Sequence, residues 1–217
     1  MIFPRIYDRI NMLCSAERGR KYRNLNIREK WYVIQTRAGI EDSVKGSCVS
    51  CLSESRIERI FVPKIELKRK YRGEWQKVEK PMYPGYIFLS IYVDDDRTGY
   101  DSSSVTGSDI IDRLFLELKK IPYLTKILGA DGIAIPLTEE DKKRIKRFIG
   151  EGDTAELSVG IIEGDRVKIF EGSLVGQEAI IKKIDRHKRT AKVEVEFMGE
   201  KRLIEVGLEI ITKNKTS

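Results

Sequence analysis

The pattern of apolar residues changes near residue 150, and this change most constrains the fold. Before it, strand-like runs are interleaved with stretches in which apolar residues recur every three or four positions, as on one face of a helix. From 161 to 212 only short strand-like runs remain, separated by turns. We therefore predict an α+β domain over 31–149, a linker over 150–160 and a small all-β barrel over 161–212.

The first domain is predicted to be an antiparallel sheet with three helices. Its strands are expected at 31–36, 60–67, 75–80, 86–93 and 123–128, and its helices at 40–52, 110–120 and 138–149. The charged stretch 64–80 turns at Arg72-Gly73, which indicates a projecting β-hairpin. The barrel strands are expected at 167–170, 179–181, 193–197, 203–204 and 208–211. Residues 1–30 are predicted to be a disordered basic arm, and 213–217 a tail.

Positive charge is concentrated in one turn between two predicted barrel strands. The chain carries a net charge of +7, and residues 182–192 hold six cationic side chains against one acidic side chain. A small barrel with a basic edge is typical of nucleic-acid binding, because lysine and arginine release condensed counterions from phosphates. A solvated turn that only keeps the strand edges soluble is the alternative. The candidate RNA-binding residues are Lys168, Lys182, Lys183, Arg186, His187, Lys188, Arg189 and Lys192.

Residue types for catalysis or metal binding are scarce in this sequence. No glycine-rich phosphate loop and no hydrolase or metalloprotease motif occurs, and His187 is the only histidine. Cys48 and Cys51 form a C-x-x-C pair, but a zinc site normally takes four ligands. We predict both cysteines to be core residues, and we expect no enzyme activity, no metal and no cofactor. No apolar stretch is long enough to span a bilayer, so a cytoplasmic location is expected. We also expect the protein to be a monomer.

The segment Tyr83-Pro84-Gly85-Tyr86 precedes a strongly apolar strand and predicts a sharp turn into the sheet. Together with other motifs it carries a resemblance to the NusG family of transcription elongation factors. The matching pieces, in order, are Trp31-Tyr32-Val33-Ile34-Gln35, Val62-Pro63, Tyr83-Pro84-Gly85-Tyr86, Pro136-Leu137-Thr138-Glu139-Glu140 and Gly164-Asp165-Arg166-Val167-Lys168. The resemblance covers 31–212 and implies the family's N-terminal domain (NGN), followed by an SH3-like KOW barrel.

This resemblance implies a function in transcription elongation or antitermination. Family members bind the clamp helices of RNA polymerase through an apolar surface, and Tyr83, Pro84 and Tyr86 match residues that form or shape it. Departures occur in the barrel, where Ser173-Leu174 and Gly207-Leu208 replace the aromatic residues that support contacts with ribosomal protein or Rho. The resemblance does not extend to those contacts.

The departures and the basic turn make the chain most similar to the specialised LoaP-type antiterminators, which recognise an RNA hairpin in nascent leaders. We therefore expect nascent RNA, as a hairpin, to be the partner of the barrel. Two alternatives remain: a general NusG-type elongation factor without selective RNA binding, and a ribosome-associated KOW module that binds RNA.

Overall fold

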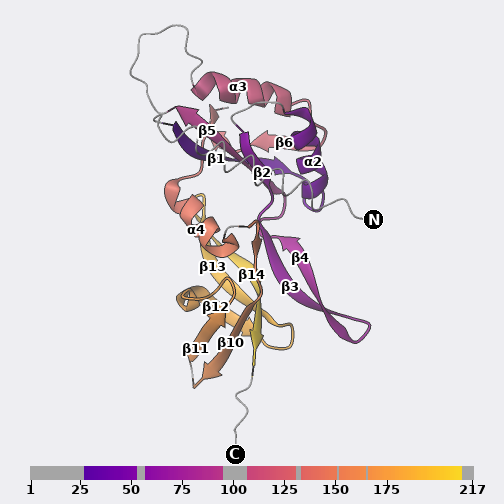
Figure 1. Cartoon of the computed structure of the whole chain (residues 1–217), viewed down its shortest axis with the longest axis vertical. Coiled ribbons are helices and arrows are strands. Elements are labelled where there is room, and N and C mark those ends of the chain that lie inside the picture. Colours follow the sequence, from indigo (N-terminus) through magenta and orange to yellow (C-terminus); the bar gives the residue numbers. More distant parts are fainter. Residues whose placement is uncertain are drawn as a thin grey trace, which may run out of the picture. The chain divides into compact units, whose positions relative to one another are not determined.

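A computed structural model describes residues 27–52, 57–94, 107–130, 133–150, 152–164 and 166–211 (Figure 1). The described chain folds as two compact units. The first comprises residues up to Ile60 together with Ile87–Pro136, and the second comprises Phe61–Tyr86 together with Leu137 and the residues that follow it. Residues 1–26 of the predicted arm, residues 95–106 and the predicted tail lie outside the described residues.

The first unit is built on a four-stranded sheet in the order β2-β5-β1-β6. Its strands are β1 (Ile27–Thr36), β2 (Ile57–Phe61), β5 (Tyr86–Asp94) and β6 (Leu124–Ile127). Its helices are α2 (Glu41–Cys51) and α3 (Gly107–Leu118), and the short strands β7 (Gly129–Ala130) and β8 (Ile133–Ala134) pair with each other. The run from Trp31 to Ile34 is buried, because β1 is a central strand of this sheet.

The second unit begins with the predicted hairpin, β3 (Lys64–Tyr71) and β4 (Glu74–Pro81). The two strands pair in continuous antiparallel register from Lys64↔Pro81 to Tyr71↔Glu74. Arg72 and Gly73 both have positive φ, 50° and 91°, which matches the two-residue turn that suits the twist of a hairpin. At its base, β3 pairs with β9 (Thr154–Ala155) in parallel.

Helix α4 (Glu139–Ile149) has the predicted N-terminal cap. The Thr138 hydroxyl accepts a hydrogen bond from the Asp141 backbone N–H at 3.1 Å, and acidic residues fill the first turn. The predicted inner face is confirmed, because Ile145, Phe148 and Ile149 are buried.

The barrel is a five-stranded sheet in the order β11-β10-β14-β13-β12. Its strands are β10 (Ser158–Glu163), β11 (Arg166–Glu171), β12 (Ile181–Asp185), β13 (Thr190–Phe197) and β14 (Glu200–Ile210), and a 3-10 turn η1 (Glu178–Ile180) precedes β12. The fold class is confirmed: an α+β part with three helices and an antiparallel sheet precedes a half-barrel.

Several details of the sequence-based assignment were wrong. Residues 27–30, expected in the disordered basic arm, form the start of β1. Residues 154–155 and 158–160 of the expected linker form β9 and the start of β10. Residues 179–180, expected in a strand, lie in η1, and the two strands expected over 203–211 are parts of the single strand β14. Cys48 is buried as predicted, but Cys51 is exposed because α2 ends there. Among the described helices, none has the length and apolar composition that a membrane crossing requires.

Candidate functional site

The Tyr83–Tyr86 segment forms a tight turn within the second unit. The Tyr86 N–H donates to the Tyr83 carbonyl at 3.2 Å, which closes a four-residue β-turn. Pro84 supplies the fixed φ of the first central position, and Gly85 has a φ of 83° at the second. A side chain at this position would be strained, so the turn needs glycine. Pro84 is exposed at the corner of the turn.

Tyr83 itself is buried against the barrel strand β13. Only 4% of its surface is exposed, and its ring stacks on Phe197 with 4.3 Å between the centroids and 19° between the planes. Tyr86 meets the same ring edge-on at 6.0 Å, and the Arg202 guanidinium lies 5.5 Å from its centroid. Burial raises the pKa of Tyr83 to about 12, and the nearby Asp141 carboxylate adds to this effect. The phenol is therefore neutral at physiological pH.

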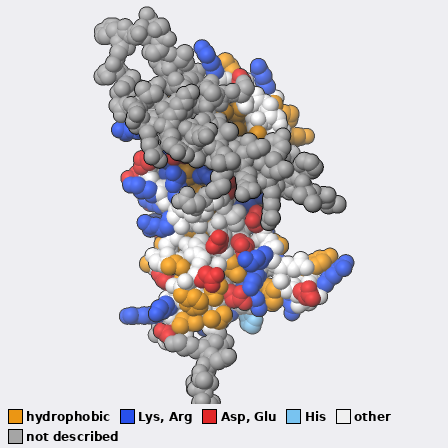
Figure 2. Space-filling model, viewed as in Figure 1, with side chains coloured by type: hydrophobic (Ala, Val, Ile, Leu, Met, Phe, Trp, Pro, Cys, Tyr) orange, Lys and Arg blue, Asp and Glu red, His pale blue; other side chains and the backbone are white. Residues whose placement is uncertain are grey.

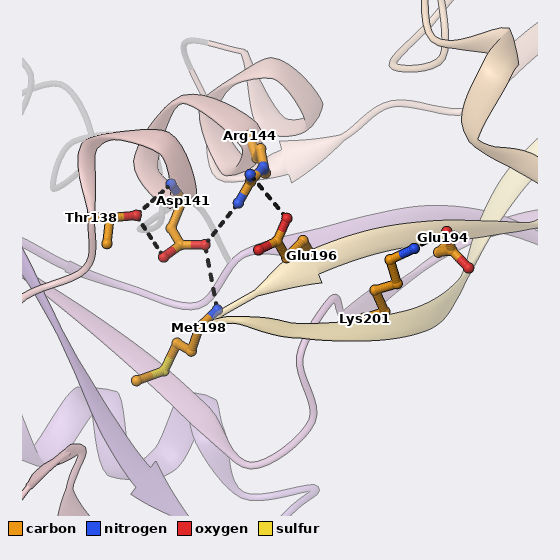
Figure 3. Close-up of polar contacts among 7 residues, drawn as sticks. All are labelled: Thr138, Asp141, Arg144, Glu194, Glu196, Met198 and Lys201. Atoms are coloured by element: carbon orange, nitrogen blue, oxygen red, sulfur yellow. Dashed lines mark hydrogen bonds and ion pairs between the residues drawn. The ribbon is translucent and has the colours of Figure 1, made fainter.

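The N-terminus of α4 contacts the turn between β13 and β14 (Figure 3). The Met198 backbone N–H donates to Asp141 Oδ1 at 3.4 Å, and Thr138 Oγ1 donates to Asp141 Oδ2 at 2.8 Å. Arg144 bridges the same carboxylate at 3.3 Å and Glu196 at 3.1 Å. Asp141 is 4% exposed, so these contacts satisfy a carboxylate that has almost no access to water. These contacts join α4 to the end of β13, where Phe197 stacks on Tyr83.

The basic turn connects β12 to β13, as predicted. The Lys188 N–H donates to Asp185 Oδ1 at 2.9 Å, and this hydrogen bond lowers the pKa of the Asp185 carboxyl. Arg189 closes the turn with a φ of 55°. The side chains of Arg186, His187 and Lys188 are exposed, whereas Arg189 is half-buried. The single acidic residue therefore shapes the turn, and the cations stand in solvent.

Two lysines face each other on the strands that leave this turn. Lys183 on β12 and Lys192 on β13 are cross-strand partners, and both are exposed. Like charges directly opposite on a sheet are destabilising. The repulsion between Lys183 and Lys192 therefore opposes the pairing of β12 and β13. Lys182 is half-exposed and lies 3.5 Å from Glu194, so its charge is partly neutralised.

A groove of about 540 Å³ lies between β11 and β12, the two edge strands of the barrel sheet. The basic residues Arg166, Lys182 and Lys183 and the acidic Glu178 line it, together with apolar side chains of Val167, Ala179, Ile181 and Ile184. Lys168 is exposed on β11 but does not line the groove. The structure therefore adds Arg166 to the basic surface and leaves Lys168 outside this groove.

Models of two protein families match the chain. The family described as transcription termination factor NusG matches residues 29–146, and the KOW motif matches 163–196. The chain belongs to the NusG family. NusG-family proteins are non-enzymatic transcription termination and antitermination factors, and membership implies binding to RNA polymerase.

Curated NusG proteins resemble the chain along most of its length. The termination/antitermination protein NusG of Campylobacter jejuni is 25% identical over 181 residues, which is 82% of this chain and 93% of that protein. NusG of Helicobacter pylori is 25% identical over 183 residues, with 81% and 93% covered, and NusG of Rickettsia bellii is 26% identical over 190 residues, with 86% and 90% covered. A structure that describes a domain interaction in Thermotoga maritima NusG is similar with a TM-score of 0.50 and 21% identity, and covers 84% of this chain and 94% of that one.

Within this NusG-family chain, the predicted site residues separate into two groups. Tyr83, Pro84 and Tyr86 form one turn, and seven of the eight predicted RNA-binding residues lie on β12, β13 and the turn between them; Lys168 lies on β11. Two residues that contact members of these groups, Phe197 and Trp75, were not predicted from the sequence, and neither was Asp141, whose carboxylate lies near Tyr83. In the part of the chain that the structure describes, no group of three or more possible metal ligands occurs.

Proposed function

We propose that this protein is a specialised antitermination factor that binds the clamp helices of RNA polymerase through the Tyr83–Tyr86 turn and a nascent RNA hairpin through the basic turn of its barrel. Its place of action is the cytoplasm, and it acts as a monomer. The observation that carries the RNA assignment is the exposed Lys183–Lys192 pair beside the exposed cations Arg186 and Lys188. Such a cluster fits a phosphate backbone.

Polymerase binding through Tyr83 requires the ring to leave Phe197. With 4% of its surface exposed, Tyr83 offers almost no area to a partner. The covered and uncovered states are then two members of one ensemble, and a partner that binds only the uncovered state shifts the population toward it. Polymerase affinity therefore includes the free energy of opening the stack.

The polymerase part is tested by capture of core RNA polymerase with the full-length protein and with Tyr83→Ala. We expect the variant to lose capture because the aromatic contact is removed. Tyr123→Ala is the matched control, since Tyr123 is a tyrosine with 69% of its surface exposed. Equal capture by wild type and Tyr83→Ala would refute the assignment of Tyr83.

The RNA part is tested by titrating a labelled RNA stem-loop at several salt concentrations. A triple replacement of Lys183, Arg186 and Lys192 by glutamine should lower the affinity and reduce the salt slope by about one for each lost phosphate contact. The control carries the same replacements at Lys143, Lys146 and Arg147, three exposed cations of α4. RNA binding that is unchanged in the first variant would refute the barrel assignment, and sequence-independent binding would favour a general factor.

A further inference from the structure

The β3–β4 hairpin is a basic segment of the second unit, like the barrel turn. Residues 64–81 contain seven cationic and three acidic side chains, a net charge of +4, and residues 182–192 have a net charge of +5. The summed net charge of these two segments is larger than the net charge of the whole chain, which is +7. Residues 1–30 also carry a net charge of +5, so the residues outside these three segments are acidic overall.

Aromatic rings accompany the cations on this hairpin. At its tip, Tyr71 is 57% exposed, and the Arg72 guanidinium lies 5.2 Å from the centre of its ring. On β4, the ring of Trp75 lies under the guanidinium of Arg189 at 4.2 Å. Exposed aromatic rings beside arginine are what unpaired RNA bases stack on, whereas a hairpin that only needed solubility would carry charge alone.

Contacts within the second unit hold the hairpin beside the basic turn. Glu209 on β14 pairs with Arg189 at 2.7 Å and also with Lys68 of β3, and Arg69 pairs with Glu205 at 3.0 Å. The approach is close: a Cβ on Gly207 would lie 2.4 Å from the Glu66 carbonyl oxygen. This contact explains why glycine occupies a position at which the sequence departs from other family members.

The register of the hairpin makes the two basic segments continuous. Lys70 is the cross-strand partner of Trp75, so their side chains share a face of the hairpin, and Trp75 in turn stacks on Arg189. Lys70, Arg72 and Lys188 are exposed around this contact. On the face drawn in Figure 2, the hairpin shows blue side chains interspersed with orange and red ones.

We infer that the β3–β4 hairpin is a second RNA-binding element and that it forms, with the basic turn, one composite surface joined at the Trp75–Arg189 contact. This inference rests on the RNA-binding part of the proposed function. The barrel turn binds phosphates of the stem through Lys183, Arg186 and Lys192. The hairpin tip adds phosphate contacts through Lys70 and Arg72 and offers Tyr71 to an unpaired base of the loop.

The test compares three variants of the full-length protein on a labelled RNA stem-loop across a salt series. The hairpin variant is Lys70→Gln with Arg72→Asn, because asparagine tolerates the positive φ of 50° at position 72. The turn variant is the triple replacement described above, and the control is Lys143→Gln with Arg147→Gln on α4. A phosphate contact is worth about eightfold in affinity between 1 M and 0.1 M salt, so the hairpin variant should bind tens of times more weakly at 0.1 M, with a salt slope smaller by about two.

The outcomes separate the inference from the proposed function. Weaker binding by both the hairpin and the turn variants, with an unchanged control, supports the composite surface. Loss in the turn variant alone overturns the inference and leaves the barrel as the RNA site. No loss in either variant overturns both. A hairpin variant that keeps RNA but loses polymerase would assign the hairpin to a protein surface and also overturn the inference.

A replacement that leaves the charge unchanged tests the Trp75–Arg189 contact itself. Trp75→Ala removes the ring under Arg189 without changing the charge, so the affinity should fall about fivefold, which corresponds to about 1 kcal/mol. Gln76→Ala, next to it on the opposite face of the hairpin, is the control. The chain has two tryptophans and Trp31 is 0% exposed, so acrylamide quenching reports Trp75. RNA should protect Trp75 from acrylamide; unchanged quenching at saturating RNA would contradict the composite surface.

Discussion

Replacing Phe197 by alanine is expected to strengthen polymerase capture even though it weakens the barrel. The Phe197 side chain is 1% exposed and covers Tyr83. Removing a buried phenylalanine costs about 3–5 kcal/mol, which includes the cavity that it leaves. A stacked aromatic pair contributes about 0.5–1.5 kcal/mol of this beyond the buried area.

Part of this loss of stability affects only the state in which Phe197 covers Tyr83, and only that part alters polymerase binding. The stack on Tyr83 and the edge contact with Tyr86 exist only while Tyr83 is covered, and we assign about 2 kcal/mol to them and the area they bury. Weakening the covered state by that amount raises the uncovered fraction about 30-fold as long as it stays minor. The apparent Kd for polymerase falls by the same factor.

The assay is equilibrium binding of labelled full-length protein to core RNA polymerase without RNA. Val195→Ala is the control, because Val195 is a buried residue of the same strand and its loss destabilises the barrel without removing the Tyr83 stack. Circular dichroism at the assay temperature checks that both variants are folded. If Phe197→Ala bound polymerase no more tightly than Val195→Ala, the covered state would not limit access and the reasoning would fail.

Three further predictions concern local chemistry. Because burial raises the pKa of Tyr83 from 10.0 to about 12, its neutral form stabilises the fold below pH 10, and a contribution of about 3 kcal/mol is lost as the pH rises through 12. Denaturant unfolding at about pH 9 and about pH 11 should show a smaller loss for Tyr83→Phe than for wild type; equal losses would contradict the assignment. Thr138→Ala removes the cap of α4 and should cost about 1 kcal/mol in thermal unfolding, with Thr138→Ser as the control that keeps the hydroxyl. Burial raises the pKa of the Cys48 thiol to about 11, so a maleimide at neutral pH should modify the exposed Cys51 first, as peptide mapping would show; equally rapid modification of Cys48 would refute its burial.

Strands and helices with a regular apolar pattern were predictable from the sequence. β1, β5 and α4 bury their apolar residues as the periodicity requires, and the cap of α4 is a local signal. The strand β10 was missed because the glycines around it indicate a linker. Gly160 is nevertheless part of this strand. The position needs glycine because a Cβ there would lie 2.7 Å from Ile169 Cδ1 on the neighbouring strand. That requirement comes from the neighbouring strand and leaves no trace in local sequence.

The site was predictable only in its local parts. The Tyr83–Tyr86 turn and the barrel turn depend on proline, glycine and charge within a few residues, and both form where they were expected. Phe197 covers Tyr83, and the ring of Trp75 lies under the Arg189 guanidinium. In each of these pairs the two residues are distant in sequence. A buried phenylalanine at the end of a strand looks like an ordinary core residue, so its contact with Tyr83 follows only from the tertiary fold.

The two halves of the proposed function place different demands on the second unit. The cations of the barrel turn and the hairpin tip are exposed in the arrangement described, so RNA binding there needs no rearrangement. Tyr83 is covered, so polymerase binding through Tyr83 must first break the stack on Phe197. Opening therefore lowers polymerase affinity but leaves the intrinsic RNA affinity unaffected by the state of Tyr83. A factor of this kind can hold its RNA before it engages polymerase, and tethering through that RNA then raises the local concentration at which the uncovered Tyr83 meets its partner.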